Sequence, residues 1–409
     1  MRFLSTFIQK PQILATRRTY TLDGKLTGHC GPVLCLSATD DGQLLASGGT
    51  DGVKIWNLVT KRRIPSPEGA GSRGATTAIL FISRSDDPDE AIIYGTQTGK
   101  LAFEESYTFS LAGASEITTL AFDAVAGHLG AGNRSGNIYL FSLDVDMNLK
   151  IRFSVMLQGV TPKSLAFSNK GDKKEPQLLL FSLYDGTLYT LNTTDGNVEN
   201  TKVLVNQIGN AAVDVAKNVF CIDDPGQGIA LYRFDGTRLK NFPVKEEKPR
   251  PRPRQVNFAE GFKLIVCGSD HGVVYVFDRR KEEVVDELHT GNHNWIQTIL
   301  TAQTDGQHFI LAAPSHDTDK NTDILVWRKR DSRTIGMQMQ RKYLQYFIQI
   351  MMLGATLAFL IQNGAQMLGS QPSSMVTDLP ITRSMKQTPQ RVLATERTRI
   401  PRKAELVLP

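Results

Sequence analysis

Residues 27–57 read TGHCGPVLCLSATDDGQLLASGGTDGVKIWN. The apolar runs in this stretch have the length of β-strands, and turn residues at Asp41-Gly42 and Asp51-Gly52 separate them. Short apolar runs joined by Asp-Gly turns are typical of antiparallel strands. The stretch therefore predicts a small antiparallel sheet.

The same stretch resembles a WD40 repeat. Gly28-His29 is followed by Trp56-Asn57 in place of the usual Trp-Asp, with 26 residues between His29 and Trp56. In that family a His, a Ser or Thr, a turn Asp and the Trp indole form a buried hydrogen-bonded network. The resemblance assigns these roles to His29, Ser47, Asp51 and Trp56. Because buried polar groups need partners, we expect this set to be structural rather than catalytic.

Turn glycines that lead into apolar runs recur along the chain. The first and last of six such glycines are 220 residues apart, so five intervals give a spacing of 44. The spacing matches the WD40 repeat length of about 40–45 residues. The glycines are Gly52, Gly99, Gly136, Gly186, Gly228 and Gly272. With a seventh copy ending at Trp327, the period predicts an all-β fold, a seven-bladed WD40 β-propeller over residues 17–330. Residues 17–24 are expected to close the ring by pairing with the last blade.

The later copies depart from the repeat. Blade four keeps the turn residue Asp185, and blade six keeps His271 and has Phe277-Asp278 in place of Trp-Asp. We interpret His293 as the Gly-His position of blade seven and Trp327 as its Trp position. Since only blade one has the full set of four residues, apolar packing is expected to stabilise the others.

Residues 248–254 alternate basic residues with proline. Proline favours an extended polyproline II path, so two interpretations stay open. The segment is either a stiff connector between blades five and six or a docking strip for an SH3-like domain or an acidic surface. The strip would use Lys248, Arg250, Arg252 and Arg254.

A long apolar stretch follows the repeats. Tyr343 and Ile361 bound 19 residues without a charge, and six basic residues lie between positions 328 and 342. A helix needs about 20 apolar residues to cross a bilayer, and basic residues favour the cytosolic side. We therefore expect a transmembrane helix over 343–361, with a cytosolic propeller, a basic linker over 331–342 and a disordered tail over 362–409. The alternatives are a helix that packs on the propeller, docks a partner or lies on the membrane surface.

The N-terminus suggests another location. Residues 1–16 are expected to be flexible, and the chain has basic residues but no acid up to residue 22. This composition is typical of mitochondrial transit peptides, so mitochondrial import is the alternative to an unspecified membrane. The degenerate propeller with its C-terminal apolar stretch is similar to WD40 proteins of mushroom-forming fungi, a likeness that implies no activity.

Composition argues against several functions. The net charge is +6, but residues 1–22 and 378–409 carry +4 each, so the rest of the chain carries −2. Because the body of the chain is not basic, we do not expect it to bind nucleic acid. The four cysteines form no Cys-x-x-Cys pair, and neither a phosphate-binding loop nor a catalytic or metal motif occurs. We read the cysteines as small buried residues and expect no metal, cofactor or small-molecule substrate.

WD40 propellers usually bind proteins, so the resemblance implies a non-catalytic protein–protein interaction scaffold, tethered here to a membrane. One alternative is a soluble WD40 adaptor whose C-terminal helix docks a partner. The other is a propeller enzyme, which would need carboxylates or histidines that converge in the central channel. The partner is expected to be a protein or peptide on a propeller face.

Overall fold

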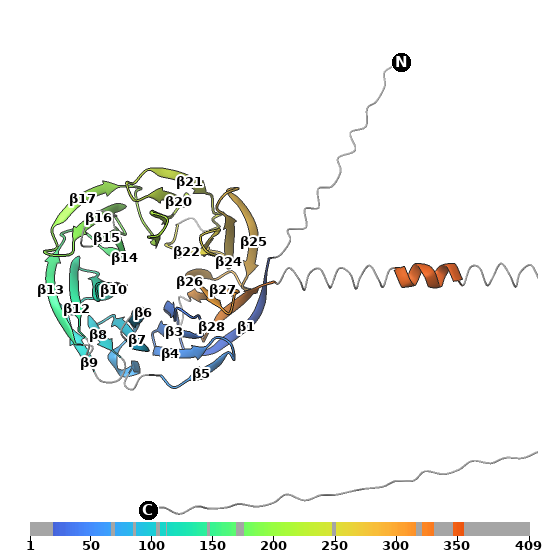
Figure 1. The fold of residues 1–409 in the computed structure, drawn as a ribbon, viewed down its shortest axis with the longest axis horizontal. Coiled ribbons are helices and arrows are strands. Elements are labelled where there is room, and N and C mark those ends of the chain that lie inside the picture. The colour runs from blue at the N-terminus through green and yellow to red at the C-terminus, as the bar shows by residue number, and fades with distance from the viewer. Residues whose placement is uncertain are drawn as a thin grey trace, which may run out of the picture. The chain divides into compact units, whose positions relative to one another are not determined.

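The structure is a computed structural model that describes residues 19–66, 70–84, 87–103, 107–111, 113–144, 148–168, 176–247, 251–315, 321–330 and 347–355. The chain divides into one unit over 1–335 and a second over 336–409. The first unit contains seven four-stranded antiparallel sheets arranged in a ring (Figure 1). The prediction of an all-β, seven-bladed propeller is confirmed.

The blades follow one another along the chain, each with its first strand innermost (Figure 1). Blade one contains β2 (Val33–Ala38), β3 (Leu44–Gly49), β4 (Gly52–Asn57) and β5 (Arg62–Ile64). A 3-10 turn, η1 (Ala70–Arg73), leads to blade two, with β6 (Thr76–Arg84), β7 (Asp87–Thr96), β8 (Lys100–Phe103) and β9 (Tyr107–Ser110). Blade three contains β10 (Ile117–Asp123), β11 (His128–Asn133), β12 (Asn137–Leu143) and β13 (Leu149–Met156). Blade two therefore has all four strands, although β8 and β9 are short.

The second half repeats this order. Blade four contains β14 (Pro162–Ser168), β15 (Gln177–Ser182), β16 (Thr187–Asn192) and β17 (Val198–Val203). Blade five contains β18 (Asn210–Asp214), β19 (Val219–Asp224), β20 (Gly228–Arg233) and β21 (Arg238–Phe242). Blade six contains β22 (Val256–Ala259), β23 (Leu264–Cys267), β24 (Val273–Asp278) and β25 (Glu283–His289). Blade seven contains β26 (Trp295–Thr304), β27 (Gln307–Ser315) and β28 (Thr322–Lys329).

The outer strand of blade seven comes from the other end of the propeller. β1 (Tyr20–His29) pairs antiparallel with β28, with Leu22 opposite Trp327. The backbone N–H of Arg330 donates to the carbonyl of Thr19 at 2.9 Å. Blade six holds the same strand, because Asp286 Oδ2 accepts the backbone N–H of Thr19 at 2.7 Å and of Tyr20 at 2.8 Å. The first strand thus joins the two ends of the ring.

Apolar packing joins neighbouring blades. Each of the seven buried clusters contains residues of two adjacent blades; Trp56 and Leu45 of blade one, for example, pack with Leu311 and Val326 of blade seven. Burial of a large apolar side chain contributes about 1.5–3 kcal/mol. The faces of the sheets are therefore stabilised against each other, and no blade buries its core alone.

A second set of contacts joins the innermost strands. Side chains at equivalent positions of successive blades accept a backbone N–H from the next blade: Thr119 from Leu165 (3.0 Å), Ser164 from Ala211 (3.0 Å), Asn210 from Val256 (3.3 Å) and Gln255 from Ile299 (2.8 Å). Thr298 Oγ1 then donates to the carbonyl of Val33 at 3.3 Å and so joins blade seven to blade one. We call these five side chains the inner belt. The sequence pattern does not predict the inner belt.

The turn glycines have a conformational reason. All six have φ between +61° and +107°, a region that only glycine adopts freely. A Cβ atom on Gly186 would lie 1.9 Å from the carbonyl oxygen of Val205, and one on Gly272 would lie 1.7 Å from that of Asn292. At Gly186 and Gly272, glycine therefore lets the turn pass close to the link between blades.

The cysteines are all free, but one differs from the prediction. Cys35, Cys221 and Cys267 are buried, and burial raises the pKa of each thiol. Cys30 is exposed, because it lies in the link between β1 and β2 rather than in a strand. The expectation of a buried residue was wrong at this position.

In the second unit, residues 347–355 are helical and exposed. The other residues of the predicted span 343–361, together with the linker 331–342 and the tail 362–409, lie outside the described residues, as does the N-terminal stretch 1–16. Among the described residues, no helix combines the length and the apolar character needed to cross a bilayer.

Candidate functional site

The structure brings the four predicted residues of blade one together. His29 Nδ1 lies 2.6 Å from Asp51 Oδ1, and His29 Nε2 lies 2.7 Å from Ser47 Oγ. The Trp56 indole donates to the same Ser47 oxygen at 2.8 Å. Trp56 and His29 are almost fully buried. We call these four residues the blade-one network.

The electrostatics of the network fit a structural role. Burial alone would raise the pKa of Asp51, but hydrogen bonds from Lys54, the backbone N–H of Cys30 and His29 lower this pKa to about 2. Burial lowers the pKa of His29, although Asp51 opposes the change. At neutral pH a carboxylate therefore orients a neutral imidazole. Both ring nitrogens are used inside the blade, so neither is left to act on a substrate.

Blade six shows how the network is replaced. In blade one, Trp56 pairs with Leu45 and Lys54 with Ser47; in blade six, Phe277 pairs with Ile265 and Tyr275 with Cys267. Phe277 thus occupies the Trp position, and Cys267 occupies the Ser position. A phenyl ring has no N–H to donate, so the buried hydroxyl is not needed. The two replacements belong together, because either one alone would leave a polar group without its partner.

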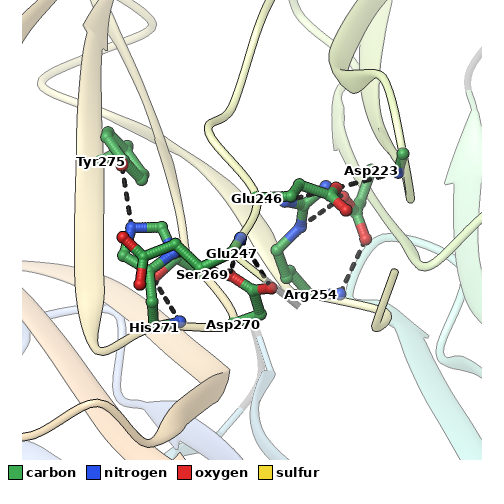
Figure 2. Close-up of polar contacts among 9 residues, drawn as sticks. Asp223, Glu246, Glu247, Arg254, Ser269, Asp270, His271 and Tyr275 are labelled. Atoms are coloured by element: carbon green, nitrogen blue, oxygen red, sulfur yellow. Dashed lines mark hydrogen bonds and ion pairs between the residues drawn. The ribbon is translucent and has the colours of Figure 1, made fainter. Parts of the chain in front are cut away.

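His271 belongs to a different contact set. Its Nδ1 lies 2.7 Å from Asp270 Oδ1, and its Nε2 lies 3.0 Å from the Tyr275 hydroxyl (Figure 2). The Asp270 carboxylate also accepts the backbone N–H of Glu247 at 3.1 Å. Asp270 therefore resembles Asp51, which accepts the N–H of Cys30 from the preceding link at 2.8 Å.

The remaining predicted positions are mostly structural. Asp185 accepts the Tyr189 hydroxyl at 2.7 Å, Asp278 accepts backbone N–H groups of the turn that follows it, and Trp327 is buried between blades six and seven. His293 corrects the prediction: it is exposed in the link between β25 and β26, so it does not take the buried position of His29.

The predicted docking strip is also corrected. Arg254 is only 2% exposed and cannot contact a partner. Its Nε donates to Asp223 Oδ1 at 3.0 Å, its Nη2 lies 2.8 Å from the same oxygen, and its Nη1 lies 3.3 Å from Glu246 Oε1 (Figure 2). The reason is Asp223, a fully buried carboxylate on β19 that needs a counter-charge. The sequence pattern could not reveal this, because Asp223 lies 31 positions earlier.

Carboxylates bind the residues on both sides of the rest of the strip. At one end, Asp270 binds the backbone of Glu247; at the other, Asp223 binds Arg254. Between them, the Arg252 guanidinium lies 5.1 Å from the centroid of the Trp295 ring, a cation–π contact. Lys248 and Arg250 lie outside the described residues. Arg254 is therefore a buried ion-pair residue of the propeller, and the basic segment left as a docking candidate is residues 248–252.

The central channel contains a cavity of about 220 Å³ lined by the inner strands of all seven blades. Its polar lining comes from four side chains of the inner belt, all except Thr298, and from Asn257, Thr77, Thr118 and Lys163. Burial lowers the pKa of the Lys163 ammonium. Carboxylates and imidazoles are absent from the lining in the part of the chain that is described. Likewise, the described ranges contain no group of three or more His, Cys, Asp or Glu side chains that could hold a metal ion.

Replacing Trp56 by alanine tests the blade-one network. The change removes a fully buried indole and its hydrogen bond to Ser47, so we expect the free energy of unfolding to fall by about 3–5 kcal/mol. Urea denaturation of the full chain measures this loss. Val125→Ala is the control, since Val125 is 90% exposed and its loss should cost less than about 0.5 kcal/mol. A loss below about 1 kcal/mol for Trp56→Ala would contradict the network.

Replacing Arg254 by methionine leaves Asp223 buried without its counter-charge, and we expect a loss of about 3–5 kcal/mol at pH 7.5. Burial raises the pKa of Asp223 to about 6 even beside Arg254. The folded chain therefore holds more protons than the unfolded chain between about pH 4 and 6. As the pH rises through that window, the contribution of this carboxyl to the free energy of unfolding falls. Without Arg254 the pKa should rise further, so the loss should shrink at pH 5.

The control for this measurement is Arg134→Met. Arg134 forms an ion pair with Glu116 at 2.8 Å, but its side chain is 62% exposed. Its loss should cost less than about 1 kcal/mol, with little change between pH 5 and 7.5. Equal losses for the two arginine variants, or a loss at Arg254 that does not depend on pH, would show that Asp223 does not need the counter-charge.

The comparisons with known proteins agree with the fold. A family model described as "WD domain, G-beta repeat" matches residues 20–57. Pre-mRNA-processing factor 19 of Oryza sativa subsp. japonica is 26% identical over 129 residues, 30% of this chain and 24% of that protein. Pre-mRNA-processing factor 19 homolog 2 of Arabidopsis thaliana is 28% identical over 127 residues, 30% of this chain and 23% of that protein. The matches thus span about a quarter of the length of these relatives. The chain thus contains a match to a WD40 repeat over residues 20–57, within a seven-bladed β-propeller.

Proposed function

We propose that the chain is a non-catalytic protein–protein interaction scaffold. Its partners bind the face that carries the links between blades, and its C-terminal segment tethers it to a membrane. WD40 propellers commonly bind proteins, and loops on a rigid framework are where binding residues concentrate. The polar residues of the repeat are used inside the blades, so the loops carry the recognition.

The basic segment 248–252 is the observation that selects the face. Asp270 binds the backbone of Glu247, directly before the segment, and Asp223 binds Arg254, two residues after it, so the points where the chain enters and leaves the segment are fixed. Proline at three of the alternate positions between 248 and 254 stiffens it further. A fixed basic, proline-rich segment suits an acidic peptide or an SH3-like domain.

The two other functions have less support. An enzyme with its site in the channel would need converging carboxylates or histidines, and the described lining offers hydroxyls, amides and Lys163 instead. A soluble adaptor differs from the proposal only in what the C-terminal segment contacts. Residues 347–355 are helical, and the exposed fractions of Phe347, Ile350 and Leu353 are 61%, 69% and 75%.

This apolar exposure supports the membrane tether. A contiguous apolar surface is costly in water and marks a surface that contacts a partner or a membrane. The six basic residues between 328 and 342 precede the segment, and the positive-inside tendency places them, and the propeller, in the cytosol. The propeller closes at Arg330, before this segment begins.

Partner capture tests the proposed face. The test variant for proximity labelling is the triple substitution Lys248→Ala/Arg250→Ala/Arg252→Ala. The label on specific partners should fall at least about tenfold, which corresponds to about 1.4 kcal/mol of binding energy. The matched control is Lys217→Ala/Arg280→Ala/Lys281→Ala, which removes the same charge from exposed turns between other strands. Equal labelling by both variants would exclude the basic segment as the recruiting element.

Carbonate extraction tests the tether. The full chain should stay with membranes, whereas a chain that ends at Arg330 should be released and should still unfold cooperatively, because the ring closes without the tail. Separate mitochondrial and microsomal fractions decide between the mitochondrial alternative and another membrane. Release of both chains would exclude an integral anchor. An unfolded shorter chain would show that the C-terminal segment belongs to the fold.

A further inference from the structure

Blade six carries a pocket of about 370 Å³ that is separate from the channel. Three segments form it: the link that precedes the blade, the turn before β24 with the start of that strand, and the end of β25 with the link that follows it. The first segment contributes Lys245 and Glu247, the second His271 and Tyr275, and the third Glu287, His289 and His293. The pocket therefore lies on the same face as the anchored basic segment, whose Glu247 anchor is part of its wall.

The floor of the pocket presents a hydrogen-bond acceptor. The Asp270 carboxylate can only accept a hydrogen bond, so His271 Nδ1 donates to it and carries a hydrogen. His271 Nε2 must then accept the Tyr275 O–H at 3.0 Å (Figure 2). With its hydrogen directed to His271, the Tyr275 oxygen can only accept from a ligand. Tyr275 is 6% exposed, so its oxygen is not freely solvated.

The walls present two carboxylates. Glu247 lies 3.2 Å from Lys245, and Glu287 lies 3.9 Å from His289; all four side chains are more than a third exposed. Exposed pairs of this kind contribute about 0–1 kcal/mol and are easily exchanged. The pKa of Tyr275 is raised to about 12, chiefly by burial. The negative charges of Glu287 and Glu247 are among the further causes. Both carboxylates thus act at the hydroxyl on the floor.

We infer that this pocket binds the cationic side chain of a partner protein, with arginine as the preferred residue. The carboxylates of Glu247 and Glu287 accept N–H groups of the guanidinium, and the Tyr275 oxygen accepts a third. Arginine suits the site because its planar group presents five donors in a fixed arrangement. Apart from the histidines, the two glutamates and Lys245 give the walls a net charge of −1. The inference rests on the proposed function, since it specifies what a bound partner contributes.

The probe is Nα-acetyl-L-arginine amide, and its neutral isostere Nα-acetyl-L-citrulline amide is the matched control ligand. The full chain, labelled with ¹³C at histidine Cε1, has seven histidines. We expect the arginine probe to shift the signals of His271, His289 and His293 saturably at pH 7.5, and to leave that of His29 unchanged. Replacement of each histidine by glutamine assigns the signals.

Three variants decide whether the named groups bind the probe. Glu247→Gln and Glu287→Gln should each weaken binding about tenfold, which corresponds to 1.4 kcal/mol, and Tyr275→Phe should weaken it less. Glu116→Gln removes a glutamate elsewhere and should have no effect. An equal response to citrulline, the absence of a saturable shift, or unchanged binding by both glutamate variants would overturn the inference. Proximity labelling of partners through residues 248–252 does not depend on the arginine probe and could still succeed. The two experiments therefore distinguish failure of the pocket from failure of the proposed face.

Discussion

The pairing of β1 with β28 is the contact on which the rest of the structure depends. A propeller blade buries its two faces only against its neighbours, so an open array would expose two sheet faces and two strand edges. The chain avoids this by using its first strand as the outer strand of its last blade. Asp286 of blade six also holds the start of that strand. Two adjacent blades therefore share the closure.

Once the ring is closed, individual blades can lose the repeat motif. The blade-one network is complete, whereas blade six has an apolar pair, Phe277 with Cys267, in the equivalent places. The inner belt explains why this loss is tolerated, because it links blades through backbone N–H groups and does not need the motif. The repeat thus sets the geometry of one blade, and contacts between blades maintain the others.

The parts of the fold that the sequence predicts are those with a strict residue requirement. A turn with positive φ close to a carbonyl oxygen needs glycine, so the spacing of 44 residues between turn glycines can be read from the sequence. An indole that donates to a hydroxyl needs Trp and Ser, so the blade-one network was visible as well. The inner belt was not, because Thr, Ser, Asn and Gln can each accept an N–H. Arg254 was misassigned because its burial depends on the carboxylate of Asp223, which lies 31 positions earlier in the sequence.

Hydrogen exchange of the intact chain, measured by mass spectrometry, tests the closure most directly. Residues 20–29 pair with β28 along most of their length, so their amides should be protected to the same extent as those of residues 322–329. Both segments should then open together, as parts of one sheet. If residues 20–29 exchange at the rate of an unstructured peptide while residues 322–329 stay protected, the ring is not closed by its first strand, and the account is wrong.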